Sequence, residues 1–281
     1  MRRIGVFLVA ALLGACDFGT LADLNEDTAA QGADELTTQA LSLWRTFDPM
    51  KATDADVKKA IADIQGIVAR NPPPLQVRLG PIDKDDQAIV GITDKDPSTA
   101  QGMLLIHEID CSLDQISKLV IALNQTAIYP DLYDSYTRVY TSDVNGFLEG
   151  TPPTVTWTTN YQASALSRTY QSEVRGEGRY VGGAMPNGAP IFLDRAFLPH
   201  PALFIKGGDD SGFDQDYQIE LYYETAPNKV MHFYALWRDF HISTVSSDTD
   251  LYVNLVLGNL SDFDVRSSKV CKDGSPQPAF Q

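Results

Sequence analysis

The sequence predicts an α+β fold in which two N-terminal helices precede an antiparallel sheet and a further helix ends the chain. Three observations support this prediction. Apolar residues repeat at helical spacing early in the chain, short runs rich in β-branched and aromatic residues fill 136–242, and a helical pattern returns after Asp248. Successive strands joined by short polar turns favour an antiparallel meander.

Two amphipathic helices are predicted at the N-terminal end of the folded part. The first covers residues 34–47, where leucine, tryptophan and phenylalanine side chains share one side, and Asp48-Pro49 ends it. The second begins at the N-cap Thr53 with an acidic first turn, and its apolar residues repeat at helical spacing up to Asn71. We expect the two helices to form an antiparallel hairpin.

Short strands and a third helix follow the hairpin. Strand candidates at 75–79 and 88–92 lie on either side of an acidic turn. A longer strand is predicted over 103–110, and Ser112 forms a capping box with Gln115. A helix therefore begins directly after that strand.

The remaining strands form most of the predicted sheet. Their ranges are 136–141, 154–161, 166–174, 178–181, 191–197, 203–205, 217–224 and 230–242. The last strand is apolar on both faces at its centre, so both of its sides must be covered. A helix that starts at Asp248 can cover one side with an apolar stripe that includes Leu251 and Leu255.

The first sixteen residues have the features of an export signal. Arg2 and Arg3 form a basic tip, residues 4–13 are apolar but too short to span a bilayer permanently, and small residues precede Cys16. The segment Leu-Gly-Ala-Cys that ends at Cys16 resembles the lipobox of bacterial lipoproteins. This resemblance implies that Cys16 becomes the N-terminus and carries lipid, and several acyl chains anchor a protein stably. The alternatives are a secretory peptide that happens to end in cysteine, and an uncleaved membrane anchor.

The lipobox resemblance also implies a location. The protein is expected in the bacterial cell envelope, lipid-anchored and facing the periplasm or the cell surface, and not in the cytoplasm. Asp17 resembles the inner-membrane retention signal of enterobacterial lipoproteins, a sorting rule that not all bacteria follow.

Charge and cysteine content narrow the classes of partner. The formal net charge of −15 argues against nucleic acid and anionic lipid head groups as partners. With Cys16 assigned to lipid, Cys111 and Cys271 are a possible disulfide pair in an oxidising compartment. The alternative is two separate buried thiols.

The order of elements from residue 103 resembles that of a known family. A strand leads through a short polar turn into a helix within 109–116, a Tyr-Pro turn lies at 129–130, and a long meander ends in a helix near Asp250. This order resembles the helix-grip fold of START-like (SRPBCC) ligand-binding domains. The resemblance implies a curved antiparallel sheet that grips the C-terminal helix around a mostly apolar cavity. Such domains commonly bind lipids, sterols, polyketides or other hydrophobic molecules.

The resemblance completes the predicted division of the chain. The segments are a signal peptide at 1–15, a flexible acidic linker at 16–32, the helical hairpin with short strands at 33–101, a START-like domain at 102–272 and a disordered tail at 273–281. Residues 33–101 are either a separate domain or an extension of the sheet, and their short strands favour an extension.

No sequence motif supports catalysis, a metal or a cofactor. The histidines lack metal-ligand spacing, although a site assembled from distant strands stays open, and they are His107, His200, His232 and His241. The aspartate-rich segment 207–216 lacks the EF-hand order and is typical of a solvated turn. No Gly-x-Ser-x-Gly, Walker loop or Ser-x-x-Lys pattern occurs, and the glycines of 175–183 precede no helix. We therefore expect no metal, no cofactor and no catalytic residues.

Aromatic residues at the centres of predicted strands are candidate ligand contacts. Most aromatic side chains on strands belong to a core, but ligand pockets are apolar with a few polar groups. The candidates, including two polar residues of the last strand that could orient a ligand, are Trp157, Tyr170, Phe192, His232, Trp237 and Arg238.

Three functional hypotheses follow. The preferred one is a membrane-anchored envelope lipoprotein that binds a lipid or another hydrophobic small molecule without catalysis. The alternative is a structural or protein-interaction lipoprotein with a filled core, whose protein partners the sequence leaves open. A cyclase-like or hydrolytic enzyme is a third hypothesis, based on fold analogy alone.

Overall fold

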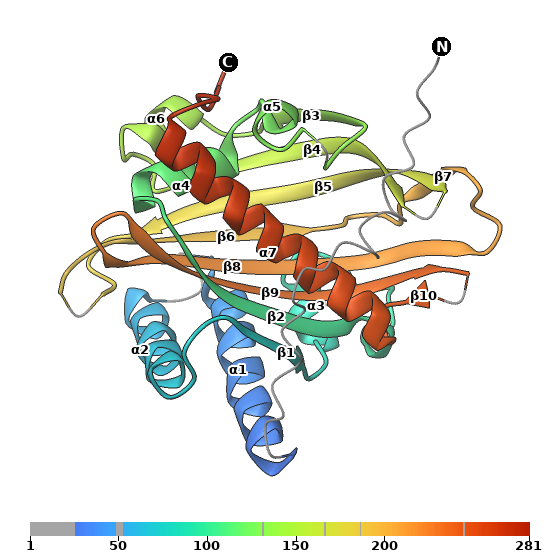
Figure 1. Ribbon diagram of the computed structural model, residues 1–281, viewed down its shortest axis with the longest axis horizontal. Helices are drawn as coiled ribbons and strands as arrows, with labels where there is room; N and C mark the ends of the chain where they lie inside the picture. Colours follow the sequence, from blue (N-terminus) through green and yellow to red (C-terminus); the bar gives the residue numbers. More distant parts are fainter. Residues whose placement is uncertain (1–25, 49–52, 131, 166, 186, 244) are drawn as a thin grey trace.

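The computed structural model describes residues 26–48, 53–130, 132–165, 167–185, 187–243 and 245–281. Its central element is a ten-stranded antiparallel sheet (Figure 1). The strands follow the order β1-β2-β9-β8-β6-β5-β4-β3, with β7 beside β5 and β10 beside β9. Their bounds are β1 Leu75–Leu79, β2 Gln101–Ile109, β3 Ser135–Tyr140, β4 Thr154–Ala165, β5 Arg168–Val181, β6 Ile191–Phe197, β7 Leu203–Lys206, β8 Ser211–Ala226, β9 Lys229–Ile242 and β10 Val245–Ser246.

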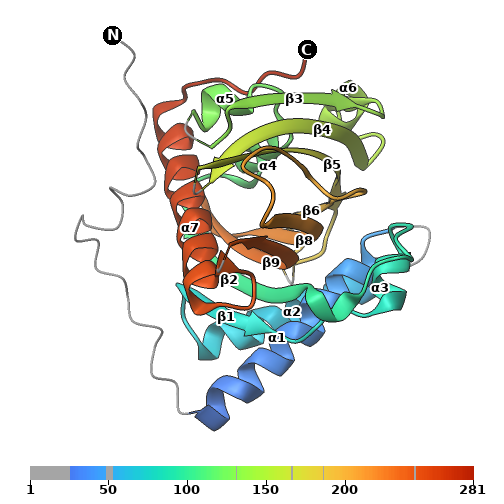
Figure 2. The same cartoon turned by 90° about the vertical axis from the view of Figure 1, so that its right-hand side faces the viewer.

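The sheet curves, and the C-terminal helix α7, Asp250–Asp273, closes its open side (Figure 2). The hydroxyl of Thr249 accepts a hydrogen bond from the backbone N–H of Tyr252, which caps the helix N-terminus. Gly274, in the left-handed conformation with φ 65°, ends the helix. A curved antiparallel sheet gripping a C-terminal helix, after an N-terminal helical hairpin, is confirmed.

Helices α1, Glu26–Thr46, and α2, Asp54–Arg70, pack against the convex face of the sheet (Figure 2). Large side chains of the helices and of the central strands form this convex core, among them Trp44, Ile61 and Trp237. The first helix begins eight residues before the predicted start, so the last seven residues of the predicted linker are helical. The run Glu-Asp-Thr-Ala-Ala-Gln after residue 25 explains this, because acidic residues suit a helix N-terminus and alanine and glutamine favour helix.

Residues 33–101 extend the sheet. Strand β1 pairs along its whole length with β2, and α1 and α2 cover strands of the same sheet. The strand predicted at 88–92 is wrong, because α3, Lys84–Ala88, and a turn take its place. Asp83 caps α3 by accepting from the backbone N–H of Asp86, whose carboxylate in turn binds Arg45 at 2.6 and 2.8 Å. Local capping here outweighs β propensity.

The other short helices are the 3₁₀ turn Pro97–Thr99, α4 Leu113–Ile121, α5 Gln125–Ile128 and α6 Val144–Leu148. The predicted capping box of Ser112 and Gln115 is present at the start of α4. The strands predicted at 166–174 and 178–181 are one strand, β5. Its two central glycines lie under Trp157 and Phe192, so they make room for large neighbours instead of ending the strand.

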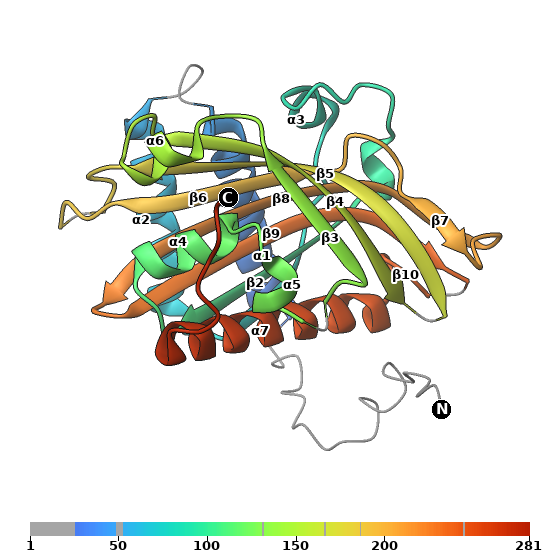
Figure 3. The ribbon, with the colours of Figure 1, turned by 90° about the horizontal axis from the view of Figure 1, so that it is seen from above.

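The C-terminal tail is ordered, which corrects the disorder predicted for 273–281. The backbone N–H of Leu123 donates to the carbonyl of Ala279 at 2.7 Å, and Asn124 exchanges hydrogen bonds with Gln277 and Ala279. The tail thus lies along α4 and α5 at one end of α7 (Figure 3). The predicted disulfide between Cys111 and Cys271 is present and ties α7 to the start of α4.

Cys16 and the rest of residues 1–25 lie outside the described residues, so the lipobox stays a prediction. Within the described ranges, no helix is both long enough and apolar enough to cross a membrane.

Candidate ligand-binding site

Five of the six predicted ligand contacts lie on the concave face of the sheet, which faces α7. Trp157 and Phe192 belong to a buried cluster there, and Tyr170 packs against another. His232 stacks on Tyr222 with ring centroids 4.3 Å apart. Arg238, on the same face of β9, lies 5.2 Å from the ring centre of Phe213. A role of these residues in ligand binding stays a prediction.

The sixth candidate, Trp237, is misplaced by the prediction. It lies in the convex core, and its indole N–H donates to the carbonyl of Gly80 at 2.8 Å. Successive residues of a strand point to opposite faces, so Trp237 cannot share a face with Arg238. It therefore does not line a space between the sheet and α7.

Tyrosine rings of β3, β4, β5 and the loop before β3 gather on the concave face. This tyrosine cluster consists of Tyr133, Tyr136, Tyr161 and Tyr170. Ring centroids are 4.8 Å apart for Tyr133 and Tyr136, 5.2 Å for Tyr133 and Tyr161, and 6.1 Å for Tyr161 and Tyr170. Burial raises the pKa of the hydroxyls of Tyr133, Tyr161 and Tyr170 above their usual range.

The four side chains of the tyrosine cluster are only half-buried, although they lie on the concave face of the sheet. Other aromatic side chains between the sheet and α7 belong to fully buried clusters. The tyrosine cluster is therefore a place where the concave face is incompletely covered.

His232 connects the sheet to α7. Its Nδ1 lies 2.8 Å from Asp264 of α7, and its Nε2 lies 3.0 Å from Glu220 of β8. Burial alone lowers the pKa of the imidazole, but the Asp264 and Glu220 carboxylates raise it to about 10. His232 is therefore an imidazolium at neutral pH and donates to both acids. His107 adds a second contact, with its Nδ1 3.3 Å from Asp264.

Glu220 and Asp194 lie side by side on β8 and β6. Glu220 accepts hydrogen bonds from the Tyr222 hydroxyl and from His232. Asp194 is 6% exposed, and its Oδ1 has no hydrogen-bond partner among the described residues. Burial, reinforced by the Glu220 carboxylate, holds the pKa of Asp194 well above its usual range. Burial thus favours the protonated form of the Asp194 carboxyl group.

Two arginines complete the polar groups of the concave face. The Nε and Nη2 atoms of Arg238 donate hydrogen bonds to the Asp216 carboxylate at 3.1 and 2.8 Å. Its Nη1 lies 3.5 Å from the Tyr252 hydroxyl of α7. Arg138 lies over Trp157, 4.6 Å from the ring centre, and donates to the carbonyl of Val120 at 2.6 Å. Each arginine is thus occupied.

Three acids of the site are absent from the residues that the sequence predicts, and they are Asp194, Glu220 and Asp264. One signal was available, since the pair Asp194-Arg195 interrupts the apolar run of β6, and a charge within a buried strand needs a partner or a function. Glu220 and Asp264 become recognisable only when β8, β9 and α7 come together, which the sequence does not show directly.

A further group could hold a cation outside the concave-face contacts described above. Asp214, Asp239 and His241 are half-buried, and each offers one ligand atom within 4.8 Å of the others. A bulge in β8 between Phe213 and Gln215 places Asp214 near the β9 residues. Sequence spacing gave no sign of this group, and the expectation of no metal stays a prediction.

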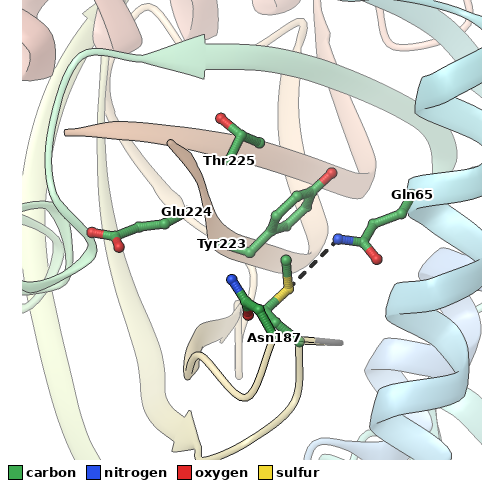
Figure 4. Close-up of a pocket in the computed structure, with 6 residues that line it drawn as sticks. Gln65, Asn187, Tyr223, Glu224 and Thr225 are labelled. Carbon is green, nitrogen blue, oxygen red and sulfur yellow. Dashed lines mark hydrogen bonds between the residues drawn. The ribbon is translucent and has the colours of Figure 1, made fainter. Parts of the chain in front are cut away.

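Two open surface hollows lie outside the concave face. One of about 340 Å³ is lined by Gln65 of α2, by Tyr223 to Thr225 at the end of β8, and by Met185 and Asn187 (Figure 4). In it, the Gln65 amide donates to the Met185 sulfur at 3.7 Å. The other, of about 320 Å³, lies between α1 and α2. Neither hollow is lined by a residue of α7.

Comparison with known proteins finds solved structures whose backbone course is similar to that of this chain. No protein-family model matches the chain, and no curated protein matches it. Solved structures include the human StarD13 (DLC2) lipid transfer and protein localization domain, at 10% identity and a TM-score of 0.38, covering 75% of this chain and 95% of that one. A START superfamily protein from Mycobacterium smegmatis has 11% identity and a TM-score of 0.33, covering 62% and 99%.

A STAR-related lipid transfer protein from Xanthomonas axonopodis has 10% identity and a TM-score of 0.34, covering 65% of this chain and 89% of that one. The chain is similar to each of these proteins, and at such values none of them assigns it a ligand or an activity.

Proposed function

We propose that this protein binds a lipid or another hydrophobic small molecule between the concave face of its sheet and α7, without catalysing a reaction. The observation that carries the proposal is the tyrosine cluster, whose half-buried aromatic side chains lie on the concave face of the sheet. Apolar walls with a few polar groups are typical of small-molecule sites, and the concave face has this composition.

We further propose that the domain works at a membrane in the bacterial cell envelope, held there by lipid on Cys16. The lipobox pattern supports this. The Cys111–Cys271 disulfide supports it too, because disulfides persist in oxidising compartments outside the cytoplasm. A hydrophobic ligand would then be collected or delivered at that membrane.

Blocking the internal space tests the binding proposal. Ala163 lies on β4 two residues after Tyr161, on the same face, and is opposite Tyr170. Ala163→Trp should fill the space and abolish binding, whereas Gln162→Trp places the same ring on the other face of the strand and should leave binding intact. Native mass spectrometry of the full chain and titration with a fluorescent fatty-acid analogue measure co-purified and added ligand.

The two outcomes separate the leading hypotheses. Extra mass and saturable fluorescence that are lost in Ala163→Trp and kept in Gln162→Trp support ligand binding. A chain that carries no extra mass and takes up no analogue contradicts the proposal, and leaves the structural or interaction lipoprotein with a filled core as the better account.

A further inference from the structure

Asp194 is a buried acid of the concave face that lacks a counter-charge among the described residues. Glu220 and Asp264 share the imidazolium of His232, and Asp216 binds Arg238. Asp194 makes no ion pair, and its Oδ1 makes no hydrogen bond. At 6% exposure, the carboxyl group is also largely cut off from water. Buried polar groups are usually paired, so this one requires an explanation.

The cations near Asp194 bind other groups and make no ion pair with it. His232 already donates through both ring nitrogens. Arg238 uses two nitrogens on Asp216. Arg138 donates to main-chain carbonyls while it stacks on Trp157. None of these three cations therefore pairs with Asp194 among the described residues.

The surroundings of Asp194 suit an organic cation. Phe192 precedes it by two residues on the same face of β6, and its ring centre lies 5.9 Å from that of Tyr222. Tyr234 lies opposite Glu220 on β9. Aromatic faces attract cations, and the attraction is stronger where water is excluded.

We propose that the bound molecule has an apolar body and one protonated amine, and that the amine pairs with Asp194. This inference depends on the proposed function, because it names the chemistry of the ligand in the same site. The ammonium donates an N–H bond to the unpartnered Oδ1 of Asp194. Its positive charge supplies the counter-charge that this carboxyl group lacks.

The same geometry disfavours other polar groups. A carboxylate ligand would place a second negative charge beside Glu220, which already accepts two hydrogen bonds. An alcohol would make only a neutral hydrogen bond, which is weaker than a charge-assisted one. The amine should therefore bind more tightly than either compound with the same alkyl chain.

Displacement of a neutral fluorescent dye tests this order. The full chain carrying Cys16→Ser, which removes the lipid attachment site, is loaded with Nile red and titrated with decylamine, decanol or decanoate at neutral pH. We expect decylamine to displace the dye at a concentration about tenfold or more below that of the other two, as one charge-assisted bond would give. Equal concentrations for the three compounds would overturn the inference.

Two variants assign the preference to one carboxyl group. Asp194→Asn should remove the advantage of decylamine and leave decanol unchanged, whereas Asp209→Asn makes the same carboxyl-to-amide change on an exposed turn and should keep the advantage. An advantage that survives Asp194→Asn contradicts the role of Asp194. If the chain takes up no Nile red and no decanol, the proposed function itself fails, which is a different result from binding without a preference.

Discussion

His232 is the residue whose acid–base chemistry is changed most clearly by the fold. Its imidazole pKa rises from 6.5 to about 10, because two carboxylates outweigh the effect of burial. A group with a raised folded pKa stabilises the protein fully below its unfolded pKa, and the stabilisation declines as the pH rises towards the folded pKa. For His232 this decline runs from pH 6.5 to about 10.

Proton NMR of the imidazole C–H groups checks this prediction. We expect the His232 signals to stay at protonated positions through pH 8, while the free energy of unfolding falls by up to about 1.4 kcal/mol per pH unit above 6.5 from this residue. His200, an exposed histidine, is the internal reference. Titration of the His232 signals near pH 6.5 would show that the imidazole lacks its two carboxylate partners.

Gly176 is predicted to be intolerant of even one added methyl group. A Cβ at this position would lie 2.1 Å from the indole nitrogen of Trp157, and Arg138 holds that indole from the other side. Gly176→Ala should lower the free energy of unfolding by about 2 kcal/mol or more. Gly182→Ala, where nothing lies within 4 Å, should change it by less than about 0.5 kcal/mol. Urea titration measures both, and similar values for the two would contradict the prediction.

Individual residues were predicted correctly where a local pattern was sufficient. They were predicted wrongly where the result depended on which face of the sheet a side chain lies on. The Ser112 capping box and the pairing of Cys111 with Cys271 were predictable from local sequence and cysteine count. The placement of Trp237 among the ligand contacts was wrong, although strand alternation alone puts it on the opposite face from Arg238. Asp194 was missed because it is notable only for lacking a cationic partner, and the sequence does not show which side chains lie near it in the assembled sheet.

At the level of elements, the links that attach α7 to the rest of the protein are spread along its whole length. The disulfide holds its C-terminal end, the His232–Asp264 pair holds its middle, and Tyr252 near its start lies within 3.5 Å of Arg238. The disulfide closes a sequence separation of 160 residues, and cross-links over long loops constrain the unfolded chain most.

Removing the disulfide should therefore be costly. Cys271→Ser is expected to lower the free energy of unfolding by about 2 to 5 kcal/mol, with the same change on reduction of the unmodified chain. Urea titration with and without dithiothreitol measures both. A chain whose stability does not respond to reductant would contradict a structural role for this bond.

Element boundaries were predicted best where a capping residue or the sharp end of an apolar run marks them. The bounds of β1 and β6 agree with the sequence-based ranges. The strand predicted at 88–92 failed because Asp83 caps a short helix, and β5 was divided because its glycines were taken as turn signals. The glycines are needed there because the Trp157 and Phe192 side chains of neighbouring strands fill the space of a Cβ. This requirement cannot be read from the β5 segment itself.

At the level of the whole molecule, element order predicted the fold class but not the arrangement of strands. Strand β2 pairs with β9, more than 120 residues later, and this pairing brings His107 beside His232. Contacts at such separations depend on how the entire sheet closes and leave no periodic trace in either segment. The acidic partners of His232 and Arg238 could not be predicted for the same reason, although the two residues themselves were candidates.

The attachment of the whole molecule to a membrane is predicted to depend on one sulfur atom. Cys16→Ser should abolish incorporation of a palmitate analogue in cells and move the protein from the membrane to the soluble fraction. Cys271→Ser keeps Cys16 and should still be labelled. Label that persists on Cys16→Ser would refute the lipobox assignment.

The early start of α1 would limit how far lipid on Cys16 lets the folded part move from a membrane. Nine residues lie between Cys16 and Glu26, where the first helix begins. Even a fully extended chain over those ten residue steps spans at most about 35 Å. Under the proposed anchoring, the protein would not carry a ligand across a wide aqueous gap. It would instead transfer the ligand to a partner close to the same bilayer.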